Sequence, residues 1–148
     1  MSKVLIVYGS TTGNTEIVAE QVAGILEGKG NDVTTKNVVD VTVAELGNGY
    51  DLTVLGSSTW GDDDIEFQED FALFYEDLDN AELKDKKVSL FGCGDSSYEH
   101  FCGAVDLLEE KMDSLGGKIV GEPLRIDGDP EESSSDIDDW AAEISGGI

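Results

Sequence analysis

Short apolar runs alternate in this chain with apolar stripes at helical spacing, and this alternation restricts the fold more than any other feature. The run Val4–Tyr8 is continuously apolar, which is typical of a parallel strand buried on both faces of a sheet. Leu52–Leu55 and Val88–Phe91 predict two more central strands, and the weaker, β-branched stretch Val33–Val39 predicts an edge strand. A fifth strand is expected around Lys118–Ile126.

Amphipathic helices are expected between and after these strands, because apolar residues recur at intervals of three or four positions on one helix face. The four faces are Val18, Val22, Ile25 and Leu26; Phe67, Phe71, Phe74 and Leu78; Val105, Leu108, Met112 and Leu115; and Ile137, Trp140, Ala141 and Ile144. The first helix is expected to end near Gly28 and Gly30 and the third at Gly116–Gly117, and the last to open at Asp129–Glu132. Strands that alternate with helices predict an α/β fold, with one doubly wound sheet covered by helices on both faces. No internal repeat or linker interrupts the pattern, so we expect a single domain over residues 1–148.

The charge balance excludes several classes of partner. The chain has 9 basic and 33 acidic residues, a formal net charge of −24. Nucleic acids and anionic membranes both attract basic surfaces, so we expect neither as a partner. No apolar run approaches the ~20 residues of a membrane span, and Val4–Val7 is too short for the apolar region of a signal peptide. Two cysteines, Cys93 and Cys102, do not make a disulfide framework, so we expect a soluble cytoplasmic protein.

Three of the expected strands run into loops rich in glycine and small polar residues. These loops follow the first, third and fourth strands at 9–15 (GSTTGNT), 56–62 (GSSTWGD) and 92–98 (GCGDSSY). The carboxyl ends of parallel strands meet at one edge of a sheet, and doubly wound folds bind ligands at that edge. The three loops together therefore predict a binding site.

The first loop has the composition of an anion site. It carries hydroxyl and amide side chains and leads into the amino end of a helix, whose dipole and N–H groups attract phosphate. No lysine follows Gly13, so it is not a Walker A loop, and it does not match the dinucleotide pattern G-x-G-x-x-G. Without a cation in the loop, the phosphate must be solvated by the backbone and by Ser10, Thr11, Thr12, Asn14 and Thr15. A helix cap in a tight turn, with no ligand, is the alternative on these residues alone.

The second and third loops each place one aromatic residue, Trp60 or Tyr98, among small polar residues. Two aromatic faces on neighbouring loops can hold a flat ring, and each stack contributes about 0.5–1.5 kcal/mol beyond area burial. Either side chain alone can instead fill a loop without binding a ligand.

These motifs resemble those of the flavodoxins, in particular the short-chain flavodoxins of anaerobic sulfate-reducing bacteria. The resemblance covers essentially all 148 residues and rests on the segments 9–15 (GSTTGNT), 58–63 (STWGDD), 91–98 (FGCGDSSY) and 101–104 (FCGA). It implies a flavodoxin-like, five-stranded parallel sheet in the order 2-1-3-4-5. The absence of a long insertion in the fifth strand is the mark of the short-chain form.

The resemblance also implies the cofactor and its contacts. FMN would bind with its phosphate in the loop Ser10–Thr15, which includes Gly13, and with its isoalloxazine ring between Trp60 and Tyr98. Backbone groups would edge the ring, from Ser58, Thr59, Trp60, Gly61 and Asp62 and from Cys93, Gly94, Asp95, His100, Phe101 and Cys102. Ser57 stands where relatives often have cysteine, and His100 where they often have an aromatic residue. We expect these two departures to shift the redox potential while FMN binding survives.

The implied function is low-potential, one-electron transfer by non-covalently bound FMN, which shuttles between semiquinone and hydroquinone. Gly61 tolerates positive φ, so its peptide can turn a carbonyl toward the flavin N5–H that appears on reduction. We expect the acidic residues of the ring-side loops to steer a monomeric carrier toward redox partners with basic surfaces, such as hydrogenase- or reductase-like proteins. A merely solvated acidic face is the alternative for these residues.

Other classes of protein fit these residues less well. A phosphoacceptor receiver domain shares the fold, but its acidic residues are replaced here by Gly9–Ser10 and Gly56–Ser57. His100 is the only histidine, which leaves no Ser-His-Asp triad, and Asp62–Asp64 lacks the glycine and terminal glutamate of a calcium loop. The main alternative is an enzyme, a flavin-dependent quinone or NADPH reductase on the same fold. Such an enzyme needs a second anionic substrate, and none of the three loops offers Lys or Arg for a nucleotide phosphate.

Overall fold

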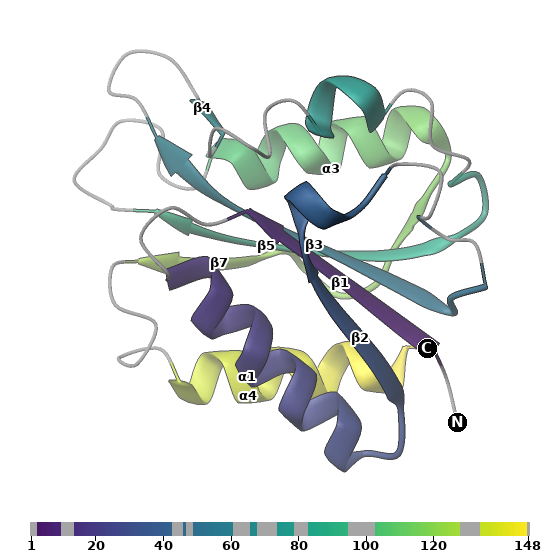
Figure 1. Ribbon diagram of the computed structural model, residues 1–148, viewed down its shortest axis with the longest axis vertical. Coiled ribbons are helices and arrows are strands. Elements are labelled where there is room, and N and C mark those ends of the chain that lie inside the picture. Colours follow the sequence, from purple (N-terminus) through teal and green to yellow (C-terminus); the bar gives the residue numbers. More distant parts are fainter. Residues whose placement is uncertain are drawn as a thin grey trace.

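The computed structural model describes the chain at residues 3–9, 14–42, 46, 49–60, 66–67, 74–78, 83–94, 103–127 and 134–147. Its elements form three layers, with a central sheet between helices (Figure 1). Helices α1 (Asn14–Gly28) and α4 (Ser134–Gly146) cover one face of the sheet, and α3 (Gly103–Leu115) covers the other. The expected α/β architecture with helices on both faces is therefore confirmed.

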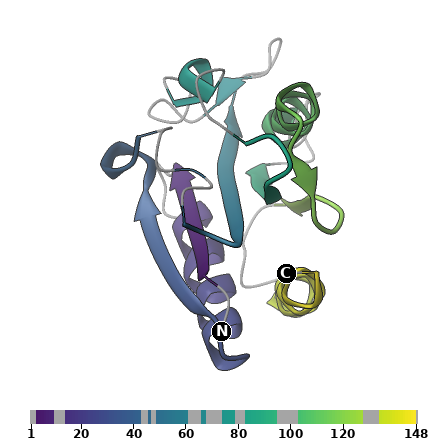
Figure 2. The same ribbon diagram turned by 90° about the vertical axis from the view of Figure 1, so that its right-hand side faces the viewer.

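The long strands of the sheet are parallel. They are β1 (Lys3–Gly9), β2 (Asp32–Asn37), β3 (Leu52–Trp60) and β5 (Lys87–Gly94), with the short strands β6 (Lys118–Ile119) and β7 (Leu124–Asp127) paired to β5. The order is β2-β1-β3-β5-β6, and Figure 2 shows β2, β1 and β3 in sequence from the left. With β6 and β7 taken as two halves of one strand, this is the order 2-1-3-4-5 that the resemblance implies.

The interruption between β6 and β7, at Val120–Pro123, is a feature that the sequence pattern did not predict. The backbone N–H of Val120 still donates to the carbonyl of Val88 at 2.7 Å, and the Ser89 hydroxyl donates to the carbonyl of Val120 at 2.9 Å. Pro123 has no N–H to donate, so the ladder cannot continue through it. Pairing resumes at Leu124, opposite Phe91.

The sheet separates two apolar cores, as the continuous apolar runs predict. Alternate residues of a strand point to opposite faces, and β1 supplies Leu5 and Val7 to the core under α3 and Val4 and Ile6 to the core under α1 and α4. All four side chains are buried. Burial on both faces explains why this strand is apolar throughout rather than alternating with polar residues.

The ends of the first and third helices lie where glycine predicts them. Gly30 and Gly116 both adopt positive φ, and each is followed by a backbone N–H that reaches back into the last helical turn. The N–H of Asn31 donates to Leu26 at 3.2 Å, and that of Gly117 donates to Met112 at 2.9 Å. These bonds satisfy carbonyl groups that a helix otherwise leaves unpaired at its end.

Strand β2 ends at Asn37 and does not reach Val39. The side-chain oxygen of Asn37 accepts a hydrogen bond from the backbone N–H of Val39 at 3.1 Å, and this bond caps the 3-10 helix η1 (Val38–Asp40). An asparagine that bonds its own backbone two residues ahead favours a turn over continued pairing.

The expectation that Phe67 opens a helical stripe was wrong. Phe67 lies in the two-residue strand β4 (Glu66–Phe67), which pairs antiparallel with Thr59 and Trp60. Phe74 and Leu78, later in the same stripe, are buried in a helical segment at 74–78. Phe71 and the predicted opening of the last helix at Asp129–Glu132 lie outside the described residues, and α4 begins at Ser134.

Candidate functional site

The carboxyl ends of β1, β3 and β5 lie side by side at one edge of the sheet. Gly9, the last residue of β1, is in register with Ser57 of β3, and Ser57 is in register with Gly92 of β5. The next pair along this edge is Ser58 with Cys93. The three loops that the sequence singles out therefore start from neighbouring points, as parallel strands require.

Strand β3 extends beyond the other strands at this edge. It continues to Trp60, three residues past the level of Gly9, and its last two residues pair with β4. The segment 61–65 thus connects the two arms of a short antiparallel hairpin. Sequence reasoning missed this hairpin, because two paired residues are too few to produce a strand pattern.

Gly56 and Gly92 lie inside strands, where the sequence analysis placed the start of loops. A Cβ atom on Gly56 would lie 2.0 Å from Cζ of Phe91, and one on Gly92 would lie 2.3 Å from Cγ2 of Val105. Glycine inside a strand often marks the close approach of another group, and here the groups are side chains of the two cores. Packing, and not ligand contact, accounts for these two glycines.

Helix α1 begins at this edge, directly after the first loop. Asn14 is its first residue, and Thr15 in its first turn is fully buried. The first N–H groups of a helix have no partner within the helix and carry partial positive charge, so they bind anions. The position of α1 therefore meets the main physical requirement of the predicted phosphate site.

The nine basic residues of the chain all lie within the described residues, and most of them lie far from this edge. Lys3, Lys87 and Lys118 open strands at the opposite edge of the sheet; Lys84 and Lys86 precede β5, and Lys29 follows α1. Of the other three, Lys36 is in β2, Lys111 lies over the Tyr75 ring with 5.1 Å between Nζ and the centroid, and Arg125 forms an ion pair with Asp106. An anion at the carboxyl edge must therefore rely mainly on backbone N–H groups and hydroxyls.

The raised pKa of Tyr8 indicates a negative electrostatic potential beside the first loop. Burial raises the pKa of its phenol above the ordinary value of 10.0, and the negative charges of Glu16, Glu20 and Asp40 raise it further. Sequence reasoning treated Tyr8 only as part of a buried run. Its place immediately before Gly9 is the signal that puts it at the functional edge.

The structure describes only part of the set of candidate site residues. It places the backbones of Asn14, Thr15, Ser58, Thr59, Trp60, Cys93 and Gly94 at the carboxyl edge. The remaining candidates lie outside the described residues: Ser10, Thr11, Thr12, Gly13, Gly61, Asp62, Asp95, Tyr98, His100, Phe101 and Cys102. The contacts of these side chains with a ligand stay predictions.

The chain matches known proteins over nearly all of its length. The sequence profile of a family described as flavodoxin matches residues 6–140. A flavodoxin from Maridesulfovibrio salexigens is 58% identical over 145 residues, which cover 98% of each chain. The chain belongs to the flavodoxin family. A flavodoxin from Nitratidesulfovibrio vulgaris is 47% identical over 144 residues and 97% of each chain.

Solved flavodoxin structures have the same fold. Oxidised flavodoxin 2 from Bacillus cereus is 36% identical, has a TM-score of 0.91 and covers 99% of this chain and 100% of its own. Oxidised flavodoxin 1 from the same organism is 33% identical with a TM-score of 0.90. Flavodoxins are electron-transfer proteins and not enzymes, and their cofactor is FMN, so this chain is an FMN-binding electron carrier. The reductase alternative is therefore rejected.

The carboxyl edge fits this cofactor chemically. A phosphate can be held by the amino end of α1, and a flat ring can lie across adjacent strand ends that carry backbone donors and acceptors.

Among the described residues, no helix is both long and apolar enough to cross a membrane.

Proposed function

We propose that this chain is a monomeric, cytoplasmic, low-potential carrier of single electrons, folded as one FMN-binding unit over residues 1–148. The observation that carries the proposal is the register that aligns Gly9, Ser57 and Gly92 beside the start of α1. FMN supplies the one-electron chemistry, and the protein sets its position and energy.

In this proposal the phosphate binds in the loop Ser10–Thr15. The amino end of α1 directs backbone N–H groups toward this loop, and no basic side chain occurs in it. Binding through N–H groups and hydroxyls holds the phosphate without adding positive charge near the ring. A site of this kind leaves the electrostatic potential around the flavin negative. A negative potential opposes the addition of a further electron to the flavin.

Trp60 and Tyr98 are proposed to flank the ring, with backbone groups of 58–62, 93–95 and 100–102 along its edge. The support is that β3 carries Trp60 past the ends of its neighbours and that the third loop leaves β5 next to it. Rings on these two segments exclude water from the flavin faces.

Partners with basic surfaces are proposed from the distribution of charge. The loops at the carboxyl edge contain Asp62, Asp63, Asp64, Asp95 and Glu99 and no basic residue, and six of the nine basic residues lie toward the amino edge. This uneven distribution of charge between the two edges orients the molecule as it approaches a basic partner. Hydrogenase- or reductase-like proteins that present Lys and Arg around their redox centre fit this requirement.

The first experiment is a stepwise anaerobic reduction of the purified protein, followed in the visible spectrum. We expect one FMN per chain, identified by mass after release, and two separate one-electron steps with the second at low potential. Uptake of both electrons in a single step, or failure to bind added FMN, would contradict the proposal.

A second experiment tests the residues proposed to hold the ring. Trp60→Ala and Tyr98→Ala should each weaken FMN binding by roughly threefold to tenfold, from the loss of one stack. Tyr75→Ala is the matched control, because Tyr75 lies beside Lys111 under α3. Equal affinities in all three variants would reject the aromatic clamp while leaving the family assignment unaffected.

A further inference from the structure

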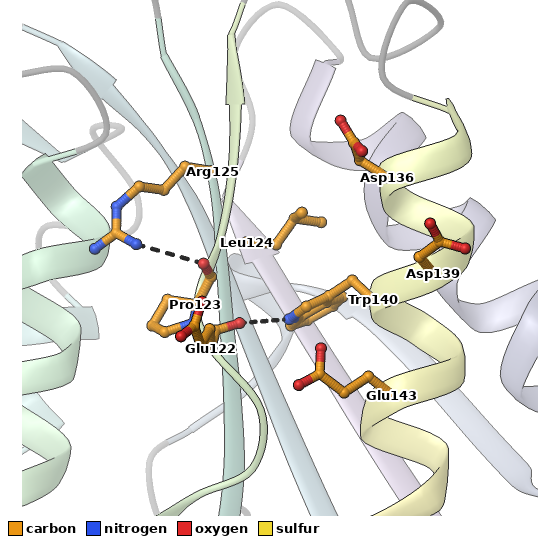
Figure 3. Close-up of a pocket in the computed structure, with 8 residues that line it drawn as sticks. All are labelled: Glu122, Pro123, Leu124, Arg125, Asp136, Asp139, Trp140 and Glu143. Atoms are coloured by element: carbon orange, nitrogen blue, oxygen red, sulfur yellow. Dashed lines mark hydrogen bonds between the residues drawn. The ribbon is translucent and has the colours of Figure 1, made fainter.

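Strand β7 forms part of the sheet edge opposite β2. It pairs with β5 from Leu124 to Asp127, and no strand of the described residues pairs with its other side. Figure 3 looks onto this edge, with the strand running up the middle and α4 to its right. The edge of a sheet is a place where an extended chain from another protein can lie alongside.

A groove of about 330 Å³ runs between the segment Glu122–Arg125 and α4. Pro123, Leu124 and the ring of Trp140 supply its apolar surface. The Trp140 indole N–H donates to the carbonyl of Glu122 at 2.7 Å, and this bond fixes the helix against the strand. The groove is therefore formed before any partner arrives.

The rim of the groove is acidic. Asp136, Asp139 and Glu143 follow each other along one exposed side of α4, and Glu122 lies across from them. Arg125, the one basic residue of the lining, turns away from α4 and forms its ion pair with Asp106 of α3. Four acidic residues thus line the groove, and the cation of its lining is paired with a carboxylate on another helix.

The spacing of these carboxylates indicates an extended chain and not a metal ion. Among the residues that the structure describes, no three acidic, histidine or cysteine side chains converge closely enough to hold a metal. Along the helix axis, Asp136, Asp139 and Glu143 are separated by about 4.5 and 6 Å. Alternate side chains of an extended polypeptide repeat about every 6.6 Å, a distance that flexible lysine side chains can match.

We propose that this groove binds an extended segment of a partner protein that carries Lys or Arg at alternate positions. Its small side chains lie against Pro123 and Leu124, and its cations lie against the acidic rim. Asp127, at the end of β7, pairs with Gly94, so the groove leads up to the edge from which the third loop starts. The groove is thus a docking point separate from the cofactor contacts, and its existence does not depend on them.

The test uses the ¹⁵N-labelled holoprotein at low ionic strength and a capped hexapeptide of alternating lysine and threonine. Two double variants remove the same two charges at the same helical spacing: Asp139→Asn with Glu143→Gln on α4, and Glu109→Gln with Asp113→Asn on α3. The α4 variant should bind the peptide roughly fivefold more weakly than the parent, from the loss of two exposed ion pairs. The α3 variant should bind it like the parent, and chemical-shift changes should be confined to β7 and the adjoining side of α4.

Three results would overturn the proposal. If both double variants bind the peptide equally weakly, the binding is a general electrostatic attraction to a chain of net charge −24 and not a property of the groove. Equal affinity for an isomeric peptide with its three lysines adjacent would remove the argument from spacing. Displacement of the peptide by one equivalent of Mg²⁺ at constant ionic strength would assign the carboxylates to a metal ion. FMN binding is recorded in every sample, so failure of the groove and failure of the cofactor site are distinguishable.

Discussion

Replacing Thr53 by valine should stabilise this protein, because the Thr53 hydroxyl is buried with nothing to bond. Thr53 is 0% exposed, and within the part of the chain that the structure describes its Oγ1 has no hydrogen-bond partner. It lies in the middle of the sheet, in register with Leu5 on one side and Val88 on the other, both in the core under α3. A polar atom in such surroundings loses its bonds to water and gains none in return.

The size of the effect follows from the cost of an unpaired hydroxyl, which is about 1–3 kcal/mol in protein mutational data. Valine has nearly the shape of threonine, so the substitution leaves no cavity. Taking the lower end of that range, Thr53→Val should raise the free energy of unfolding by about 1 kcal/mol and Tm by roughly 3 °C. In urea the midpoint should rise by about 0.5 M with an unchanged slope.

Ser89→Ala is the matched control for this assay. Ser89 is also fully buried, in the next strand, but its hydroxyl donates to the carbonyl of Val120 at 2.9 Å. Its removal should lower stability by about 1 kcal/mol, opposite in sign to Thr53→Val. A Thr53→Val variant that is no more stable than the parent would refute the reasoning, since it would mean that the hydroxyl has a partner such as a bound water.

Three further substitutions test other features of the structure. Burial and nearby acids raise the pKa of Tyr8 above 10.0, so the folded state loses stability as the pH rises past about 10. In urea titrations Tyr8→Phe should therefore lose less stability than the parent between pH 7 and pH 10.5, and equal losses in the two proteins would contradict this cause. Asp85 has a φ of 64°, so Asp85→Ala should cost about 1 kcal/mol in calorimetry while Asp85→Gly should not, and equal effects would exclude backbone strain. Gly56→Ala would place Cβ 2.0 Å from the Phe91 ring and should lower the free energy of unfolding by about 1–3 kcal/mol. Adding Phe91→Leu should restore part of this loss, and a double variant with no recovery would exclude the clash as its cause.

The sequence predicts the layers of this fold because the central strand β1 is buried on both faces and because glycines mark the ends of two helices. The run Val4–Tyr8 is typical of a strand buried on both faces, and the glycines after α1 and α3 are typical helix ends. These signals are local, so one stretch of residues is enough to read them.

Features that depend on distant residues could not be predicted. Phe67 fits a helical stripe as well as a strand, and its pairing with Thr59 decides the matter. Gly56 looks like the start of a loop until Phe91, 35 positions later, is seen to pack over it. The ion pair of Arg125 with Asp106, which leaves the groove beside α4 acidic, likewise joins a strand to a helix on the other face.

The placement of the cofactor edge on β1, β3 and β5 has a consequence for how FMN is exchanged. Each of these strands has neighbours on both sides, and amide hydrogens of such central strands exchange only when much of the domain opens. We therefore expect the sheet to stay folded when FMN is lost, with the slowest-exchanging amides in these same three strands, so that FMN rebinds without refolding of the sheet.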